Sequence, residues 1–236
     1  MNLSNISQSR LGPEEKSKNL NFIRMLYSLS SLELLIALIW TSFALSYYNE
    51  FGKGIETQWW WAIVTGVICL ILILLTLFVN QLRAPPINLI IYIVFVLCFM
   101  HFVSWLCLKD KTYLVYYGLW LLFAISVGLT LYAWSTTTYM QTLVSLIVVA
   151  VSCLVVFVVF LIFTEIWFLW LIIIVIGAMV VGFYLNYDVR RMVRGGLYDY
   201  GDDDAWTGAV RIWAEGLLVF CRFFEMLGKG CCKNKF

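Results

Sequence analysis

Long apolar stretches, each about the length of a membrane span, are the feature that most limits what this chain can fold into. A helix needs about 20 mostly apolar residues to cross a hydrocarbon core of about 30 Å. Such stretches follow one another along nearly the whole chain, separated by short polar breaks. Hydrophobic residues make up 63% of the chain and charged residues only 13%, which leaves too little polar surface for a soluble domain. The sequence therefore predicts an all-α integral membrane bundle.

The apolar stretches predict one transmembrane domain of seven helices over residues 22–228. A disordered cytosolic tail, 1–21, precedes it, and a short basic and cysteine-containing tail, 229–236, follows it. The longest internal loop is predicted at 188–204, directly before the last helix. The seven predicted helices cover residues 22–48, 59–81, 87–108, 113–134, 140–163, 166–187 and 206–227.

The seventh stretch differs from the others because it carries four charges. Arg211, Glu215, Arg222 and Glu225 fall on one stripe of a helix at about 100° per residue. One interpretation is an amphipathic helix that lies flat on the membrane. The other, which we favour, is a spanning helix whose stripe faces the bundle, because a lone charge at mid-membrane costs about 3 kcal/mol. Arg211 and Glu215 are one turn apart, so they could pair within the helix.

Lysine and arginine residues predict the orientation, because cytosolic loops carry an excess of them. With a cytosolic N-terminus and seven crossings, the outside loops hold only Lys53, Lys109 and Lys111. The lysines of the tail 229–236 disagree, since seven crossings place them outside, and they favour the flat interpretation. The inside segments hold Arg10, Lys16, Lys18, Arg24, Arg83, Arg190, Arg191 and Arg194.

Residues that suit enzymatic chemistry are scarce. His101 is the only histidine, whereas a catalytic zinc site needs several histidine or carboxylate ligands. A serine hydrolase needs a base beside its nucleophile, and the sequence contains no G-x-S-x-G motif. We interpret His101, near Ser104 and Trp105, as a hydrogen-bonded packing residue. We expect no enzyme, no bound metal and no cofactor.

Carboxylates inside the apolar stretches are the stronger functional signal. Glu33 lies in the first predicted helix, Asp188 closes the sixth, and Glu215 lies about halfway along the seventh. Intramembrane acids mark ion paths or proton relays. Two carboxylates that lie close together cannot both ionise cheaply, so they would share a proton near neutral pH and release it as the pH rises. A passing cation would compete with that proton.

Structural roles remain open for two of these acids. Glu33 equally fits a polar residue that is hydrogen-bonded across helices. Asp188 could instead pair at the membrane surface with one of the basic residues that follow it, Arg190, Arg191 and Arg194.

Several short motifs occur in an order and spacing typical of one membrane-protein family. They are Phe22-Ile23-Arg24-Met25-Leu26-Tyr27, then Glu33-Leu34-Leu35 where Gln-Leu-Leu is usual, then Arg83-Ala84-Pro85-Pro86-Ile87-Asn88, then Tyr187-Asp188 with Gly195-Gly196, and finally Ala209-Val210-Arg211-Ile212-Trp213-Ala214-Glu215. On these motifs, residues 22–227 resemble the transmembrane Bax-inhibitor-motif family and especially its Lifeguard branch.

The resemblance implies six helices around a central, acid-bearing seventh helix. It also implies calcium leak from the endoplasmic reticulum and related stores, and restraint of cell death. The family's pH sensor is an aspartate pair gated by an arginine. By position, the pair falls on Asp188 and Glu215, and the nearest match to the arginine is Arg83.

This chain departs from the family pattern in ways that bear on function. Glu215 replaces an aspartate, and Arg211 stands one turn away, where a neutral residue is usual. A fixed positive charge there would favour the ionised form of Glu215 and repel calcium. Arg211 is therefore a second candidate for the charge that gates the pair, and Glu33 is a candidate for lining the path.

Two functions follow as hypotheses. The first is a pH-sensitive calcium leak or channel-like protein of endoplasmic reticulum or Golgi-type membranes, which regulates calcium homeostasis and apoptosis. The alternative is a diverged, non-conducting member that modulates cell death by binding other membrane proteins. A heptahelical receptor is disfavoured, because the loops are short and offer no ligand pocket. The expected partners are the lipid bilayer, calcium ions and membrane proteins of cell-death pathways, with no nucleic acid.

Overall fold

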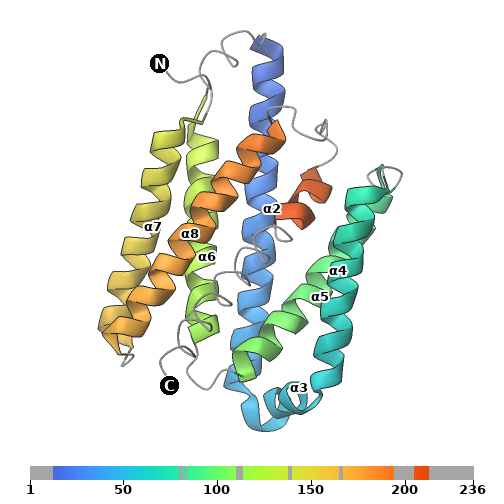
Figure 1. Cartoon of the computed structure of the whole chain (residues 1–236), viewed down its shortest axis with the longest axis vertical. Coiled ribbons are helices and arrows are strands. Elements are labelled where there is room, and N and C mark those ends of the chain that lie inside the picture. The colour runs from blue at the N-terminus through green and yellow to red at the C-terminus, as the bar shows by residue number, and fades with distance from the viewer. Residues whose placement is uncertain are drawn as a thin grey trace, which may run out of the picture.

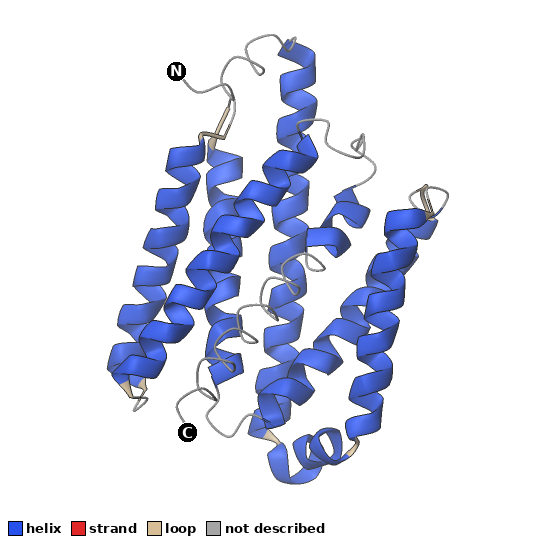
Figure 2. Cartoon of the chain, viewed as in Figure 1, coloured by secondary structure: helices blue, strands red, loops and turns tan. Residues whose placement is uncertain are grey.

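The computed structural model describes residues 13–79, 82, 84–109, 114–137, 140–164, 167–193 and 205–212. Over these ranges the regular structure is entirely helical (Figure 2). Six helices are long and apolar enough to cross a membrane, which supports the predicted helical membrane bundle. They are α2 (Pro13–Ser46), α4 (Trp59–Phe78), α5 (Ile87–Lys109), α6 (Leu114–Ser135), α7 (Thr142–Phe163) and α8 (Phe168–Val193).

The predicted count of seven spans is not confirmed, because the part of the chain that the structure describes holds six candidate spans. Of the predicted seventh helix, the structure describes residues 205–212, which are helical. The remainder of that stretch and the tail 229–236 lie outside the described residues, as do residues 1–12.

The ends of two helices differ from the prediction. α2 begins at Pro13, within the segment predicted as a tail. Proline fits the first turn of a helix, where its missing N–H costs nothing. α8 continues to Val193, so residues 188–193 are helical and do not belong to the predicted loop. No helix breaker occurs in this run, and its arginines favour the negative end of the helix dipole.

The polar break after α2 is also more ordered than predicted. It forms a short π-helix, η1 (Tyr48–Gly52), and a short α-helix, α3 (Lys53–Thr57). Aromatic rings connect this segment to the end of α2, since the Trp40 and Phe51 ring centroids are 5.4 Å apart. The sequence showed the polar residues of this break, but these ring contacts between turns could not be predicted from it.

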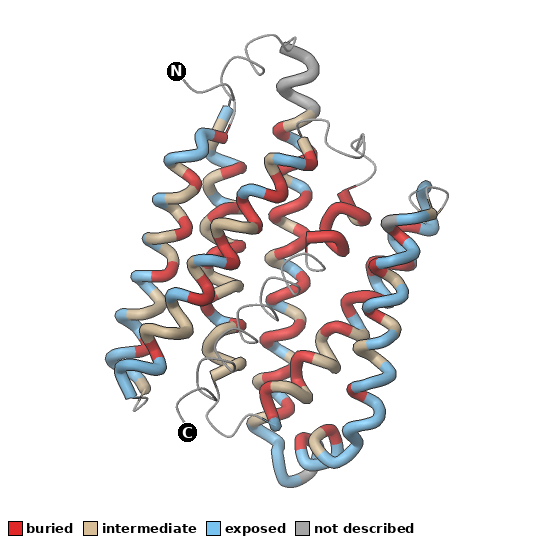
Figure 3. Tube along the Cα trace, viewed as in Figure 1, coloured by how far each residue is buried: buried red, intermediate tan, exposed pale blue. Residues whose placement is uncertain are grey.

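α2 is the central helix among the described elements (Figure 1). Its membrane-length window is 56% buried, whereas the windows of α4 and α7 are each 17% buried. α2 packs chiefly against α5 and α6, while α4 packs on α5, and α7 packs on α6 and α8. Figure 3 shows the same contrast, with buried residues concentrated on α2 and the segment 205–212 and exposed residues on α4 and α7.

Polar contacts join α2 to α6 near both ends of the bundle. At one end, the Arg24 guanidinium donates to the backbone carbonyls of Ala133 and Thr136, at 3.0 and 2.7 Å. Ala133 lies in the last turn of α6 and Thr136 directly follows the helix, where carbonyls lack helical partners and the dipole favours a cation. At the other end, the Ser42 and Tyr116 hydroxyls share a hydrogen bond of 2.9 Å.

Arg24→Gln should destabilise the bundle, because it leaves two carbonyls at the end of α6 without their charged donor. We expect the free energy of unfolding to fall by about 2 kcal/mol, the usual size for hydrogen bonds to a charged group. Thermal unfolding of the purified protein in detergent measures the change. Lys53→Gln is the matched control, since Lys53 is an exposed cation at the opposite end. Equal melting temperatures for the two variants would contradict the capping role.

Candidate functional site

Two of the three predicted acids are described, and both are buried in the bundle. The Glu33 side chain on α2 is 0% exposed, and the Asp188 side chain on α8 is 2% exposed. Glu215, the third acid, lies outside the described residues, and so does Arg83. The proposed pairing of Asp188 with Glu215 therefore stays a prediction.

Glu33 lies at about the middle of its span. Arg24 marks one end of the bundle because it caps α6, and Ser42 marks the other because it meets Tyr116 near the start of α6. Glu33 is nine residues from each of them. At 1.5 Å per residue, about 13.5 Å of helix separates the carboxylate-bearing residue from either marker. This depth is close to half of a hydrocarbon core of about 30 Å.

The surroundings of Glu33 are polar on one side. The Tyr92 hydroxyl on α5 donates to the Leu29 carbonyl at 3.2 Å, and it also interacts electrostatically with the Glu33 carboxyl. Ser30, one turn before Glu33 on α2, is fully buried. Tyr92 also reaches the segment 205–212, because its ring meets the Trp206 ring edge-on with centroids 4.9 Å apart.

Asp188 lies closer to the end of the bundle where α2 begins. It sits five residues before the end of α8, and it interacts electrostatically with the buried phenol of Tyr27 on α2. Asn186 and Arg190 are each two residues away from Asp188, which places them on the opposite side of the helix at about 100° per residue. α8 thus presents two polar faces at this end.

The second polar face of α8 binds α7. Arg190 donates to Thr142 Oγ1 at 2.7 Å, to Ser145 Oγ at 2.8 Å and to Asn186 Oδ1 at 3.2 Å. The guanidinium therefore binds the first turn of α7, and Arg190 and Asp188 both also interact electrostatically with Tyr27 on α2. Of the other basic residues considered as partners for Asp188, Arg191 is exposed and Arg194 lies outside the described residues.

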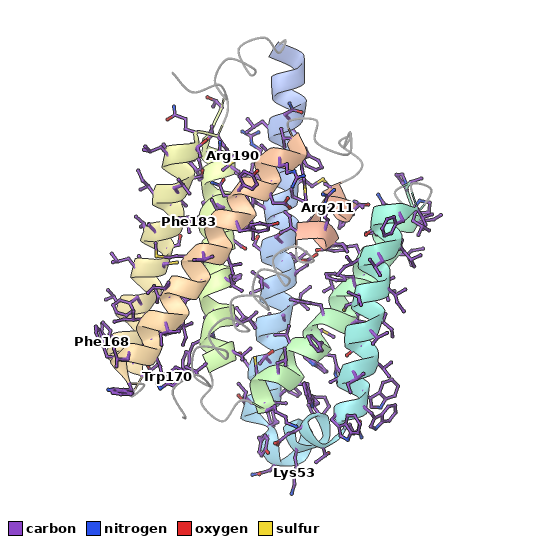
Figure 4. The ribbon with its side chains drawn as sticks, in the orientation of Figure 1. Lys53, Phe168, Trp170, Phe183, Arg190 and Arg211 are labelled. Atoms are coloured by element: carbon purple, nitrogen blue, oxygen red, sulfur yellow. The ribbon has the colours of Figure 1, made fainter. Side chains whose placement is uncertain are left out.

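Arg211 is the buried cation of the predicted site. It lies in the helical segment 205–212 and is 9% exposed. A Cβ added to Gly208 would lie 3.0 Å from Leu26 Cδ1 and 3.3 Å from Phe22 Cζ, so this segment packs closely against α2. Figure 4 shows Arg190 and Arg211 in the half of the molecule where α2 begins, with Lys53 at the opposite end.

The described interior thus holds two carboxylates, one buried guanidinium and several hydroxyls, mostly towards one end. Such groups can bind a cation or exchange a proton. Among the described residues there is no group of three or more His, Cys, Asp or Glu side chains that could hold a metal ion. His101, interpreted from the sequence as a packing residue, is half-buried on α5.

Sequence reasoning missed Tyr27, Tyr92 and Asn186 as parts of this cluster. One signal was available, because Tyr27, Ser30 and Glu33 recur every three residues along one side of the first helix. No such signal exists for Tyr92, since an aromatic residue in an apolar helix is an ordinary core residue. Its role depends on which residues of α2 and 205–212 it meets.

The family model Bax1-I, described as inhibitor of apoptosis-promoting Bax1, matches residues 19–231. No curated protein and no solved structure shows significant similarity to the chain.

Arg190→Met should loosen the contact between α8 and α7, because it removes donors to Thr142, Ser145 and Asn186 and keeps most of the aliphatic volume. We expect the free energy of unfolding to fall by about 2 kcal/mol. Thermal unfolding in detergent tests this, with Arg191→Met as control, since Arg191 is exposed on the same turn of α8. The assignment fails if both variants melt at the same temperature.

Proposed function

The chain belongs to the Bax1-I family of inhibitors of apoptosis-promoting Bax1, and on this premise we propose that it is a pH-sensitive calcium leak protein of intracellular membranes. In this role it regulates calcium homeostasis and apoptosis. We also assign it to the Lifeguard branch, on the motifs at residues 22–27 and 83–88. We expect neither enzymatic activity nor a cofactor.

The observation that carries the proposal is the burial of two carboxylates inside a bundle of membrane-length helices. Glu33 and Asp188 are 0% and 2% exposed, on helices long and apolar enough to cross a membrane. An ionisable group at such a position costs several kcal/mol on insertion scales unless it has a partner or water, so a role in moving ions is the default interpretation. Oxygen ligands are those that calcium prefers.

The residues take distinct roles in this proposal. Asp188 and Glu215 form the carboxylate pair that closes the path and shares a proton. Arg83 or Arg211 holds the closed state electrostatically. Glu33 lines the path at mid-membrane. Neutralising either member of the pair leaves the other free to ionise, which removes the shared proton.

The proposed location is an endoplasmic reticulum or Golgi-type membrane, with the N-terminus in the cytosol. Basic residues in the described elements support this orientation. Arg24 is near the start of α2 and Arg190 and Arg191 are in the last turn of α8, at one end of the bundle, whereas Lys53 begins α3 and Lys109 ends α5, at the other. The proposed partners are the lipid bilayer, calcium ions and other membrane proteins of cell-death pathways. We propose no contact with nucleic acid.

One observation favours a second candidate function. Arg211 is 9% exposed within the bundle, and a fixed positive charge in a cation path opposes conduction. The second candidate is a non-conducting member of the family that modulates cell death by binding other membrane proteins. The wild-type flux separates the two candidates.

Calcium flux into liposomes that contain the purified protein, measured at pH 6, 7 and 8, tests the leak. We expect the wild type to conduct with a pH-dependent rate. Asp188→Asn and Glu215→Gln should each change that pH dependence, because each removes one member of the pair. An unchanged pH dependence of the flux in both variants would contradict the pair model.

Glu56→Gln is the control for these variants, since Glu56 is a carboxylate in α3, outside the bundle interior, that accepts a hydrogen bond from Tyr48. It should leave the flux and its pH dependence as in the wild type. If liposomes with wild-type protein show no more flux than empty liposomes at any pH, the second candidate replaces the first.

A further inference from the structure

Three buried hydroxyls in the bundle have no hydrogen-bond partner among the described residues. They belong to Tyr27 and Ser30 on α2 and to Ser126 on α6, whose side chains are 0%, 0% and 1% exposed. Lipid offers no partner to a polar group, so a buried hydroxyl must find one inside the protein, in another side chain or in internal water. Left unpaired, it destabilises the fold.

Other hydroxyls on the same two helices bond to their own helix. Ser28 and Ser31 donate to carbonyls one turn earlier on α2, at 2.8 and 2.9 Å, and Thr130 does the same on α6 at 2.7 Å. The hydroxyls of Ser30 and Ser126 make no such bond, although this pattern is open to any serine in a helix. They are therefore available to a partner between the helices.

Tyr27 and Ser30 face the sector of α2 between α6 and the segment 205–212. Ser31 marks the direction of α6, to which it hydrogen-bonds, and Leu26 marks the direction of 205–212, which packs on it. At about 100° per residue, Tyr27 and Ser30 lie about 40° and 100° from Ser31 around the helix. Leu26 lies further round in the same direction, at about 140°.

Ser126 faces the same side of the pair formed by α2 and α6. Thr130 marks the direction of α2, and Ile125 marks that of α8, because a Cβ added to Gly182 of α8 would lie 3.1 Å from its Cγ2. Ser126 lies about 40° from Thr130, on the way to Ile125 at about 140°. The rotation has the same sense along the chain as on α2. Because the two helices are antiparallel, it turns towards the same side of both.

α8 lies against this junction. Asp188 and Arg190 on α8 both interact electrostatically with the Tyr27 phenol, yet its hydroxyl makes no direct hydrogen bond to either of them. Polar groups that act on each other without touching are commonly bridged by water. The junction of α2, α6 and α8 thus brings three hydroxyls together with charged groups that water would join to them.

The three hydroxyls are spread along the bundle. Tyr27 lies four residues to one side of the contact between Ser31 and Thr130, and Ser126 lies four residues to the other side. At 1.5 Å per residue, they are about 12 Å apart along the helix axes. Ser126 is level with the turn of α2 that carries Glu33, so the junction reaches from near the start of α2 to mid-membrane.

We propose that this junction binds a short file of internal water molecules, which the hydroxyls of Tyr27, Ser30 and Ser126 hold and which hydrates the Asp188 carboxyl. Roughly three or four waters at hydrogen-bond spacing cover the length between the outer hydroxyls. Each hydroxyl donates one hydrogen bond and accepts up to two, which suits the two to four partners that a buried water needs. The water site does not rest on the proposed function, because it requires no conduction.

Radiolytic labelling tests the file, because X-rays turn bound water into hydroxyl radicals that oxidise the side chains beside it. The full-length protein in detergent is irradiated, and the oxidation of each tyrosine is followed by mass spectrometry. We expect Tyr27 to be oxidised several-fold faster than Tyr92, which is 5% exposed but bonds to the Leu29 carbonyl. Tyr47, at 53% exposed, gives the rate in bulk water. Equal rates for Tyr27 and Tyr92 would overturn the proposal.

Ser30→Ala combined with Ser126→Ala removes two of the three hydroxyls that hold the water. The oxidation rate of Tyr27 should then fall towards that of Tyr92, while the rates of the two comparison tyrosines stay as in the wild type. A Tyr27 rate that does not change in the double variant would show that the radicals arise elsewhere, against the proposal.

Ser104→Ala is the matched control. Ser104 is a fully buried serine on α5, but its hydroxyl is hydrogen-bonded to Thr41. Its replacement should leave the oxidation rate of Tyr27 unchanged. A fall as large as in the double variant would mean that loss of any buried hydroxyl changes the labelling, and would contradict the assignment.

The melting temperature separates a hydrated junction from a dry one. In a dry junction, Ser30→Ala and Ser126→Ala each remove an unpaired hydroxyl, so each raises the melting temperature and the two rises add. In a hydrated junction each removes a hydrogen bond to water, and the two changes are not additive, because both hydroxyls hold the same file. Additive rises would refute the water file, whether or not the protein conducts calcium.

Discussion

The absence of water from the hydrocarbon core is the constraint on which the rest of this structure depends. Every polar group in the interior must find its partner within the protein. α2 meets this demand by packing against α5 and α6 and by exchanging hydrogen bonds with both. Thr41 on α2 and Ser104 on α5 share a hydrogen bond of 2.8 Å, and Ser31 approaches Thr130 on α6 at 3.3 Å. These contacts fix the register of the neighbouring helices against α2, which lipid alone could not do.

The same constraint explains why the bundle is polar at one end. α4 and α7 face lipid over most of their surface and carry no acidic or basic residue. The buried charged groups among the described residues lie instead on α2, α8 and 205–212. Arg190, which also donates to Asn186 on its own helix, binds the first turn of α7, so this polar end is also where α7 and α8 are held together. A change in charge there would act on packing and on any ion path at once.

Much of the helical layout could be predicted from the sequence, and the reasons for the remainder are physical. The long apolar runs predicted the first residues of α4 and α5 correctly, because an apolar run long enough to span a membrane is a strong signal. The predicted end of α8 is too early, because charged residues after Tyr187 suggest a loop, whereas Arg190, Arg191 and Met192 are good helix formers. The acids Glu33 and Asp188 stood out by charge alone. Tyr92 and Trp206 could not be found, because their importance comes from a contact between segments more than 100 residues apart.

At Arg211 the chain departs from the family pattern, and the physics of a buried charge determines what this departure does. A buried guanidinium requires negative partners, and breaking such a pair costs more than forming it gains. Arg211, Glu33 and Asp188 all make polar or electrostatic interactions in the interior. Among the described residues, two carboxylates and one arginine are buried. If Arg211 neutralises one acid permanently, the other can still hold a proton or a cation. A fixed charge therefore does not by itself abolish conduction: its effect depends on which carboxylate it occupies, and on whether that carboxylate is the one that a passing ion needs.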